Sequence, residues 1–439
     1  MIHSVEIFLW GTRIGVASFA EDSDVANFEY DSNFIKSGIE ISPLFMPLSN
    51  QIYSFPSLSK QSFKGLPGLL SDSLPDKFGD AVIDAWLRSK GRSLDSLTPI
   101  ERLCYVGKRG MGALEYVPSF SLDYDKNELI DIESMVSLAS DVLSKREDLH
   151  LDEEDATVAS LLKFGTSAGG ARAKAIIAIN EKTGDICSGQ ISDRKDYSYW
   201  IIKFDDIENN GDHGEQDSKG FTRVEYAYYL MAINAGIKMN ECRLKEDNGK
   251  YHFLTKRFDR EEKTGNKIHM QTLGALAHLD FNVPKCCSYE KCAQVCMRLG
   301  LGNDELCELY RRMVFNVLAI NCDDHVKNIS FLMNKKGQWS LAPAYDICFS
   351  YKPDSIWVSE HQMTINGKSK DINKLDLLQC AKSMNISERK ANTIINDVVT
   401  SISRWNDYAS IAKVKEEHIK SIGSLLEDSI NKIKIGNVS

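Results

Sequence analysis

The sequence lacks the features that mark a secreted or membrane protein. None of its uncharged runs approaches the roughly 20 residues that a membrane-spanning helix needs. The apolar run near the N-terminus, Val5–Trp10, is short and is interrupted by Glu6. It has neither a basic leader nor a small-residue cleavage site, so it does not read as a signal peptide. We therefore expect a cytoplasmic protein.

The sequence also lacks an excess of positive charge. Its 53 Lys and Arg residues are outnumbered by 62 Asp and Glu residues, which gives a net charge of −9. A protein that holds nucleic acid by itself needs a basic surface to contact the phosphates. Direct binding of nucleic acid is therefore not expected, whereas an acidic surface suits a basic protein partner.

No two cysteines have the C-x-x-C spacing of common zinc modules, although the chain contains eleven cysteines. Four of them cluster without a histidine among them: Cys286, Cys287, Cys292 and Cys296. Cys292 and Cys296 are four positions apart in a predicted helix, which favours buried thiols over a metal site. Reduced cysteines fit a cytoplasmic protein.

The Walker sequence G-x-x-x-x-G-K-[ST] is absent as well, but residues 165–174 read GTSAGGARAK. Glycines let backbone N–H groups approach an anion closely, and Thr166 and Ser167 add hydroxyl donors. The segment precedes a predicted strand. A plain hairpin or loop explains these glycines about as well as a phosphate-binding loop does.

The 439 residues, of which 43% are hydrophobic and 26% charged, suffice for two or three globular domains. Strands are predicted for an N-terminal hairpin turning at Gly11 and for residues 174–179, 199–204 and 251–257. Helices are predicted at 80–90, 98–106, 225–236, 305–320 and within roughly 387–434. The acidic, mostly helical stretch 122–155 is predicted to separate an N-terminal module from the rest.

Lys203 lies inside an apolar predicted strand, residues 199–204. A lysine there needs an anionic partner if it is buried, because an unpaired buried charge is costly. A nucleotide phosphate is one candidate, and Glu225 at the start of the next predicted helix is another. The two can share the lysine, as in the lysine–glutamate pair of protein kinases. The alternative is a solvated position on an edge strand.

The segment 253–260, FLTKRFDR, joins a predicted strand to a charged turn. Its backbone is a candidate for an adenine-binding hinge between two lobes. A simple connector with exposed charges is at least as well supported by its composition.

The residues with the most chemical potential lie at Asn321–Asn328, which reads NCDDHVKN. Asp323 and Asn328 are five positions apart, the spacing of base and metal ligand in the protein-kinase loop H-R-D-x-x-x-x-N. After one predicted hairpin, Asp346 follows the residues LAPAY. Phosphoryl transfer needs one carboxylate to accept the hydroxyl proton, and an amide and a second carboxylate to hold Mg²⁺.

Within this loop the spacing favours Asp323 over Asp324 as the base. His325 or Lys327 is placed to touch the transferred phosphoryl group. The alternative is a capped surface turn rich in Asn and Asp, which is common. The arrival of Asp346 favours the catalytic interpretation.

Together these segments resemble the HipA family of serine/threonine kinases, the toxin halves of bacterial HipBA toxin–antitoxin modules. The resemblance covers nearly the whole chain. It rests on short motifs in the same order: LWG at 9–11, GLLSDSLPD at 68–76, SAGGARAK at 167–174, KRFDR at 256–260, DDHVKN at 323–328 and Tyr345-Asp346. One studied branch of the family has glycine where this chain has Asp324.

The resemblance implies an α+β, two-lobed, kinase-like fold related to lipid kinases. It implies a β-rich N-terminal subdomain over residues 1–120, a small-lobe kinase core over 121–257 and a helical C-terminal lobe over 258–439. It also implies ATP and Mg²⁺ as cofactors. A small DNA-binding antitoxin of the HipB type is the implied partner, so that nucleic acid is contacted only through it.

The resemblance also assigns the site. Asp323 is the catalytic base, Asn328 and Asp346 hold the metal, and Lys203 binds phosphate. The glycine-rich loop covers the ATP phosphates with residues Thr166, Ser167, Ala168, Gly169, Gly170 and Ala171. Ser167 matches the serine whose autophosphorylation silences family members, with Thr166 as its substitute. Studied relatives phosphorylate an aminoacyl-tRNA synthetase.

Two other functions remain open from the sequence. The chain can serve chiefly as a non-catalytic corepressor that binds the antitoxin, or as a small-molecule phosphotransferase, because antibiotic kinases use similar acid–amide spacing. The large N-terminal module favours a protein partner.

Overall fold

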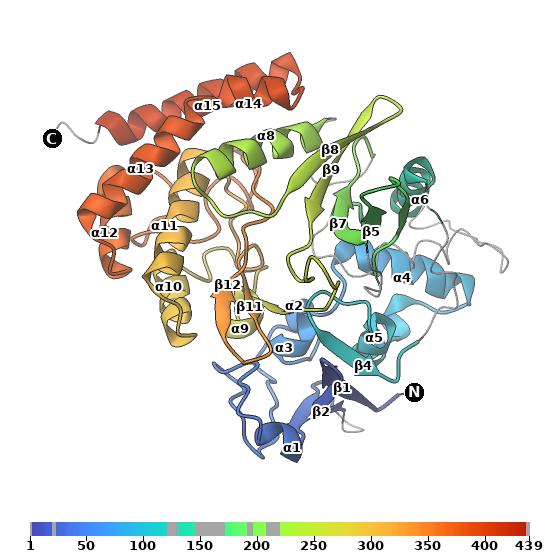
Figure 1. Ribbon diagram of the computed structural model, residues 1–439. Helices are drawn as coiled ribbons and strands as arrows, with labels where there is room; N and C mark the ends of the chain where they lie inside the picture. The colour runs from blue at the N-terminus through green and yellow to red at the C-terminus, as the bar shows by residue number, and fades with distance from the viewer. Residues whose placement is uncertain are drawn as a thin grey trace. The chain divides into compact units, whose positions relative to one another are not determined.

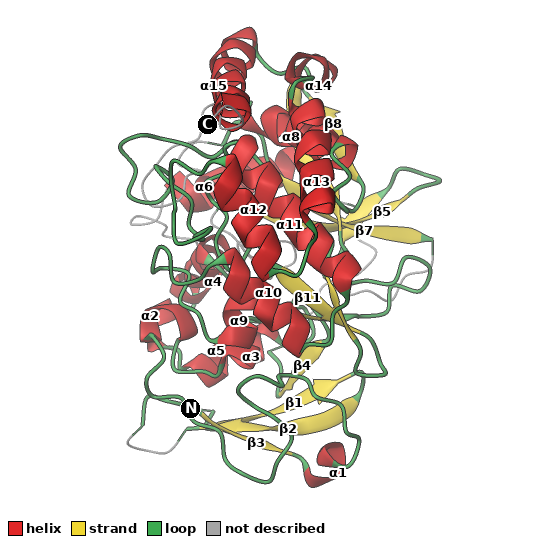
Figure 2. Ribbon diagram, turned by 90° about the vertical axis from the view of Figure 1, so that its left-hand side faces the viewer, coloured by secondary structure: helices red, strands yellow, loops and turns green. Residues whose placement is uncertain are grey.

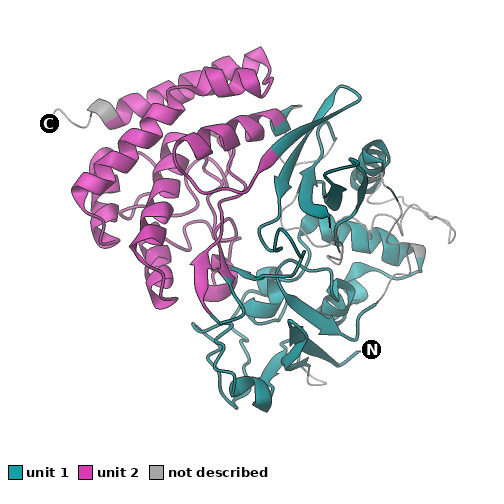
Figure 3. Cartoon of the chain, in the orientation of Figure 1, with its two compact units in different colours: residues 1–222, 243–271, 333–337 teal, residues 223–242, 272–332, 338–439 magenta. Residues whose placement is uncertain are grey.

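The computed structural model describes residues 2–19, 23–120, 129, 131–144, 172–190, 196–207 and 220–435. Contacts within the chain divide it into two compact units (Figure 3). Unit 1 comprises residues 1–222, 243–271 and 333–337, and unit 2 comprises residues 223–242, 272–332 and 338–439. Each unit is therefore built from chain segments that are distant in sequence. The three-part division at residues 120 and 257 stays a prediction.

An antiparallel four-stranded sheet begins unit 1, as the N-terminal hairpin predicts. Its strands are β1 (Ser4–Leu9), β2 (Thr12–Ser18), β3 (Asn27–Tyr30) and β4 (Leu114–Val117), in the order β3-β2-β1-β4. Leu9 pairs with Thr12 across a two-residue turn. Trp10 and Gly11 there have φ of 50° and 80°, the left-handed conformation that tight hairpins use. The predicted hairpin is confirmed.

Most helices of this part of the chain lie between β3 and β4, and one follows β4. They are α1 (Ser32–Ile35), α2 (Lys60–Phe63), α3 (Gly68–Ser71), α4 (Lys77–Ser89), the 3₁₀ turn η1 (Leu94–Ser96), α5 (Pro99–Val106) and α6 (Ile132–Ser144). α5 shows why its sequence is helical. The Glu101 N–H donates to the Thr98 hydroxyl, and the Thr98 N–H donates to the Glu101 carboxylate. Pro99 occupies the first turn, where its missing N–H is not needed.

A five-stranded antiparallel sheet carries the predicted phosphate-binding lysine. Its strands are β5 (Lys174–Asn180), β6 (Ile186–Ser188), β7 (Tyr197–Lys203), β8 (Cys242–Asp247) and β9 (Lys250–Lys256), in the order β6-β5-β7-β9-β8. Figure 2 labels β5, β7 and β8 of this sheet. Phe78 of α4, Met135 of α6 and Trp200 of β7 belong to one buried apolar cluster. That cluster makes the helices and this sheet parts of a single core.

Helices dominate the rest of the chain (Figure 1). They are α8 (Phe221–Asn234), α9 (Leu273–Ala277), α10 (Tyr289–Arg298), α11 (Asn303–Leu318), α12 (Lys374–Ser383), α13 (Glu388–Ile402), α14 (Trp405–Ile411) and α15 (Glu416–Ile435). A small sheet has the order β10 (His269–Thr272), β11 (Ser330–Met333) and β12 (Trp339–Leu341). The α+β class is confirmed. No helix in the described ranges is long and apolar enough to cross a membrane.

α11 is the central helix of unit 2. It packs against α10 and α13, and Leu309 and Phe315 are fully buried on it. Because most of its faces are covered, the loop that leaves its C-terminus starts from a rigid element. That loop carries the acidic motif.

Candidate active site

The loop Asn321–Asn328 leaves α11 through a left-handed residue. Ile320 has a φ of 55°, a conformation that β-branched residues rarely adopt. Two backbone bonds hold it there: the Ser350 N–H donates to the Ile320 carbonyl at 3.1 Å, and the Cys322 N–H donates to the Ser350 carbonyl at 3.0 Å. The loop is therefore fixed at its start by the segment that follows Asp346.

The spacing between Asp323 and Asn328 has a direct structural cause. The Asn328 side chain donates from Nδ2 to the backbone carbonyl of Asp323 at 2.7 Å. The Asn328 N–H donates to the His325 carbonyl at 2.9 Å, which closes the turn. The Asp323 side chain remains 48% exposed, so a substrate hydroxyl can reach its carboxylate. Nε2 of His325 lies 3.8 Å from the Asp323 carboxylate.

Asp346 is held in place through the residues before it. Nη2 of Arg312 donates to the Ala342 carbonyl at 2.8 Å, and Arg312 is paired at 2.9 Å with Glu308 one turn earlier on α11. The Ala344 N–H donates to the Lys238 carbonyl at 2.8 Å. Asp346 itself is left-handed, with a φ of 51°. A buried ion pair thus anchors the strand-like segment that delivers the second carboxylate.

Asp324 differs sharply from its neighbour Asp323. It is 3% exposed. Its carboxylate accepts the Tyr289 hydroxyl at 2.9 Å and the Gln362 N–H at 2.8 Å, and Nδ1 of His361 lies 3.2 Å away. A carboxylate already bonded on both oxygens is poorly placed to accept a substrate proton. This burial supports the choice of Asp323 as the base.

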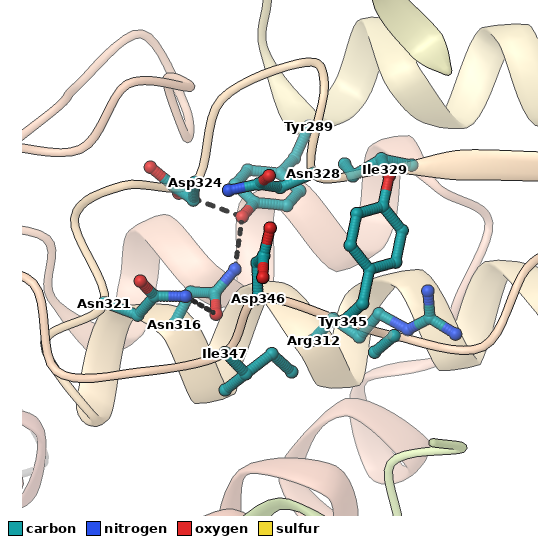
Figure 4. A pocket seen from close by; sticks show the side chains of 11 residues that line it. Tyr289, Arg312, Asn316, Asn321, Asp324, Asn328, Ile329, Tyr345, Asp346 and Ile347 are labelled. Carbon is teal, nitrogen blue, oxygen red and sulfur yellow. Dashed lines mark hydrogen bonds between the residues drawn. The ribbon is translucent and has the colours of Figure 1, made fainter. Parts of the chain in front are cut away.

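A chain of hydrogen bonds continues from Asp324 through three more side chains (Figure 4). Nδ2 of Asn316 donates to the Tyr289 hydroxyl at 2.9 Å, and Nδ2 of Asn321 donates to Oδ1 of Asn316 at 3.0 Å. Tyr289 is the first residue of α10 and Asn316 lies in the last turn of α11. The sequence did not indicate Tyr289, Asn316 or His361 as residues of the site. The only signal was the polar side chain of Asn316 on an otherwise apolar helix face.

These groups surround one hollow in unit 2. Its lining includes carboxylates, amides and the phenol of Tyr345, and it comprises Tyr289, Arg312, Asn316, Asn321, Asp324, Asn328, Ile329, Ala344, Tyr345, Asp346 and Ile347. The structure thus brings together both predicted metal ligands, Asn328 and Asp346. Oxygen donors of this kind suit Mg²⁺, so the residues present fit that ion.

Two basic residues of the loop share an aromatic neighbour. Nζ of Lys327 lies 4.4 Å from the centre of the Phe281 ring, and the His325 ring lies 6.1 Å from the same centre. A cation over an aromatic face is held electrostatically. Phe281 thus lies beside both His325 and Lys327, one of which was predicted to touch the phosphoryl group, and the sequence did not indicate this neighbour.

Lys203 is not on an edge strand. β7 lies between β5 and β9, and Lys203 is 7% exposed, opposite Lys174 on β5. Its ammonium lies 5.8 Å from the Phe253 ring centre. The solvated alternative is therefore wrong. Glu225 is also buried, in the second turn of α8 rather than at its start, and the pairing of Lys203 with Glu225 stays a prediction.

The glycine-rich loop and its candidate residues Thr166 to Ala171 lie outside the described residues. The charged segment after β9 is described, and its charges are not exposed. Arg257 binds the Asp259 carboxylate with two bonds of 2.8 and 2.7 Å, and Arg260 adds a third at 2.8 Å. Asp259 also accepts the Gly112 N–H at 2.8 Å. The segment joins two parts of unit 1 instead of forming an exposed connector.

The clustered thiols are free cysteines, and Cys287, Cys292 and Cys296 are buried as predicted, whereas Cys286 is half-buried. Burial raises the pKa of Cys287 to about 12. These side chains therefore behave as small apolar groups of the helical core.

Two family models match this chain, and both describe domains of HipA. A model of the HipA N-terminal domain matches residues 5–117, and a model of the HipA-like C-terminal domain matches residues 166–405. No curated protein sequence matches the chain.

Solved structures of two proteins match the chain to different extents. HipA from the Shewanella oneidensis MR-1 complex of HipA, HipB and operator DNA is 16% identical, with a TM-score of 0.67 over 98% of this chain and 97% of that chain. The Helicobacter pylori proinflammatory kinase CtkA is 15% identical, with a TM-score of 0.35 over 54% of this chain and 88% of that one.

Proposed function

The chain belongs to the HipA family of serine/threonine protein kinases, and from this premise we propose that it transfers the γ-phosphoryl group of ATP to a serine or threonine of a protein. Membership of a kinase family implies ATP. The same premise makes the chain the toxin of a toxin–antitoxin pair that acts in the cytoplasm.

One observation supports this function most strongly: Asn328 and Asp346 line the same hollow, and the Asn328 side chain is bonded to the backbone of Asp323. In this proposal Asn328 and Asp346 hold Mg²⁺, which would neutralise charge on the phosphates of bound ATP. Asp324 adds a fixed buried negative charge beside them.

The exposed carboxylate of Asp323 accepts the proton of the attacking hydroxyl. His325 and Lys327, held by Phe281, stabilise the negative charge of the transferred group. Lys203 binds phosphate, with Glu225 as its proposed partner. Positioning and charge neutralisation supply most of the rate acceleration in phosphoryl transfer.

The proposed target is a component of translation such as an aminoacyl-tRNA synthetase. Purified protein should be incubated with γ-labelled ATP and a lysate of its host. We expect a labelled protein whose phosphate lies on serine or threonine, and no label with the Asp346→Asn variant. Label confined to small molecules would instead support a small-molecule phosphotransferase, and no label at all would support a non-catalytic corepressor.

We further propose that the kinase phosphorylates its own glycine-rich loop at Ser167, or at Thr166 in its place. Mass spectrometry should find phosphate in the tryptic peptide 164–172, and the Asp346→Asn variant and the double variant Thr166→Ala/Ser167→Ala should each lack it. Phosphate found only elsewhere in the chain contradicts this assignment.

The proposed partner is a small DNA-binding antitoxin of the HipB type. The similar HipA from Shewanella oneidensis is in a complex with HipB and operator DNA. The net charge of −9 suits a basic partner of that kind. Co-purification of such a protein with this chain, and of operator DNA only when it is present, is the expected result.

A further inference from the structure

Asn321, the first residue of the acidic loop, has one atom whose hydrogen-bonding capacity is not used. The residue is 3% exposed, and its Oδ1 has no hydrogen-bond partner among the residues that the structure describes. Buried acceptors in proteins are nearly always bonded, because a carbonyl oxygen that leaves water without a partner costs free energy. An unpaired oxygen in a polar hollow therefore indicates a ligand that accepts its lone pairs.

The hydrogen-bond chain determines which end of the amide is unpaired. The Asp324 carboxylate can only accept, so the Tyr289 hydroxyl uses its single proton on Asp324. The hydroxyl must then accept from Nδ2 of Asn316, which turns Oδ1 of Asn316 toward Asn321. That oxygen can be met only by Nδ2 of Asn321, at 3.0 Å. Each assignment follows from the one before it, so the oxygen of Asn321 is the atom that remains.

The unpaired oxygen belongs to the lining of the hollow that contains Asn328 and Asp346. Hard divalent cations select oxygen ligands, including amide oxygens. The hollow already contains two carboxylates, Asp324 and Asp346. A neutral amide adds a ligand there without adding a third negative charge.

We propose that Asn321 supplies a third protein oxygen to the cation held by Asn328 and Asp346, and that Asp324, Tyr289 and Asn316 orient it. The inference rests on the proposed function in taking this cation to be the Mg²⁺ that accompanies ATP. It gives the buried Asp324 a role: its charge fixes the direction of three side chains that end at the metal.

The test measures metal affinity without turnover. Mn²⁺ replaces Mg²⁺, and free Mn²⁺ is titrated by electron paramagnetic resonance with the full-length protein and a non-hydrolysable ATP analogue. Asn321→Ala should weaken Mn²⁺ binding on the order of tenfold, the loss typical of a group that tunes a metal site. Asn321→Asp keeps an oxygen and should bind Mn²⁺ at least as tightly as the unaltered protein.

Asn316→Ala is the matched control, because it breaks the same hydrogen bond but keeps the Asn321 oxygen. It should weaken Mn²⁺ binding clearly less than Asn321→Ala does. Affinity for the analogue without divalent cation should be equal in all variants. If Asn321→Ala fails to fold, as a thermal melt would show, the Mn²⁺ affinity of Asn321→Asp is compared with that of the unaltered protein instead.

The outcomes separate the two proposals. If the unaltered protein does not bind Mn²⁺ with the analogue, the magnesium-dependent function fails and this inference fails with it. If it binds Mn²⁺ but Asn321→Ala matches it, or Asn321→Asp binds Mn²⁺ clearly more weakly, only the role of Asn321 is overturned. Equal losses in Asn321→Ala and Asn316→Ala would likewise overturn it, since they would show that only the shared hydrogen bond matters.

Discussion

The Tyr345 hydroxyl donates to the backbone carbonyl of Lys327 at 2.6 Å and lies 2.5 Å from Oγ of Ser330. One phenol thereby ties the segment that ends at Asp346 to the loop that ends at Asn328. This contact restrains how far the two proposed metal ligands, Asn328 and Asp346, can move apart. The relative position of the ligands is therefore constrained in part by a residue that need not touch the metal itself.

Replacing Tyr345 with Phe should slow phosphorylation more than it destabilises the fold. We expect a stability loss of about 1 kcal/mol, the usual net contribution of one hydrogen bond. The kcat should fall roughly tenfold, because small displacements of positioning groups are costly in rate. Steady-state phosphorylation and chemical unfolding measure the two effects.

Tyr310→Phe provides the control. Its hydroxyl also donates to a backbone carbonyl, that of Leu377 at 3.2 Å, but Tyr310 does not line the hollow. It should lose similar stability and keep its kcat. Equal losses of kcat in both variants would show that the Tyr345 contact has no special role.

Asp323→Asn should lose activity and keep its stability, whereas Asp324→Asn should lose stability. The Asp323 side chain is half exposed, so its amide variant should stay within about 0.5 kcal/mol in stability. Its phosphorylation rate should fall by about 10²- to 10⁴-fold, the range for loss of a general base. A normal rate on a purified substrate would exclude Asp323 as the base.

Asp324→Asn removes a buried charge that Tyr289 and the Gln362 N–H donate to. Hydrogen bonds to charged groups contribute about 1.5–3 kcal/mol each, so the loss of unfolding free energy should reach at least about 2 kcal/mol. Urea denaturation of the two variants measures the difference. Equal stability of both variants would contradict the role assigned to Asp324.

The buried pair of Glu308 and Arg312 should show strong coupling. Arg312→Met leaves Glu308 charged and buried, which typically costs about 3–5 kcal/mol. Adding Glu308→Gln removes that charge and keeps Oε1, which accepts the Lys238 N–H at 3.0 Å. The double variant should therefore regain a large part of the loss in a double-mutant cycle. Additive losses would show that the pair is not coupled.

Acid should destabilise the protein through a buried neutral histidine. Burial lowers the pKa of His269 to about 4, below its ordinary value near 6.5. Between these values the unfolded chain binds a proton that the folded chain does not, so the unfolding free energy falls as the pH falls from about 6.5 to 4. The slope from one such group approaches about 1.4 kcal/mol per pH unit.

The measurement is urea denaturation at a series of pH values in that window. His269→Gln should reduce the slope by about the contribution of one proton, whatever its effect on stability at pH 7. The exposed His3 provides the control, and His3→Gln should keep the slope. An unchanged slope in His269→Gln would show that His269 does not titrate as described.

Local sequence signals predicted several elements well. The hairpin at Gly11 and the helix predicted at 98–106 lie where their patterns placed them, and the strand predicted at 199–204 is β7, Tyr197–Lys203. Helix starts were less accurate, since α4 begins at Lys77 and α8 at Phe221, before the periodic residues on which the predictions relied. A first helical turn is stabilised by its surroundings as much as by its own residues.

The charged residues 256–260 show that composition alone does not predict whether a segment is buried. A charged turn is usually solvated, but Asp259 is neutralised by Arg257 and Arg260 and accepts the N–H of Gly112, 147 positions earlier. Burial alone would raise the pKa of Asp259, yet the two guanidinium groups hold it well below its usual value. Nothing within the pentapeptide indicates that distant partner.

The sequence by itself determined which chemical groups the protein has and how they are spaced: an acid and an amide five positions apart, a later acid, and a lysine in an apolar strand. Only the tertiary structure decided which of two adjacent aspartates is exposed and that Lys203 lies on a central strand. The physical reason is that burial and hydrogen bonding are set by partners far away in the chain. Asp324 is held by Tyr289, 35 positions before it, and by His361, 37 positions after it.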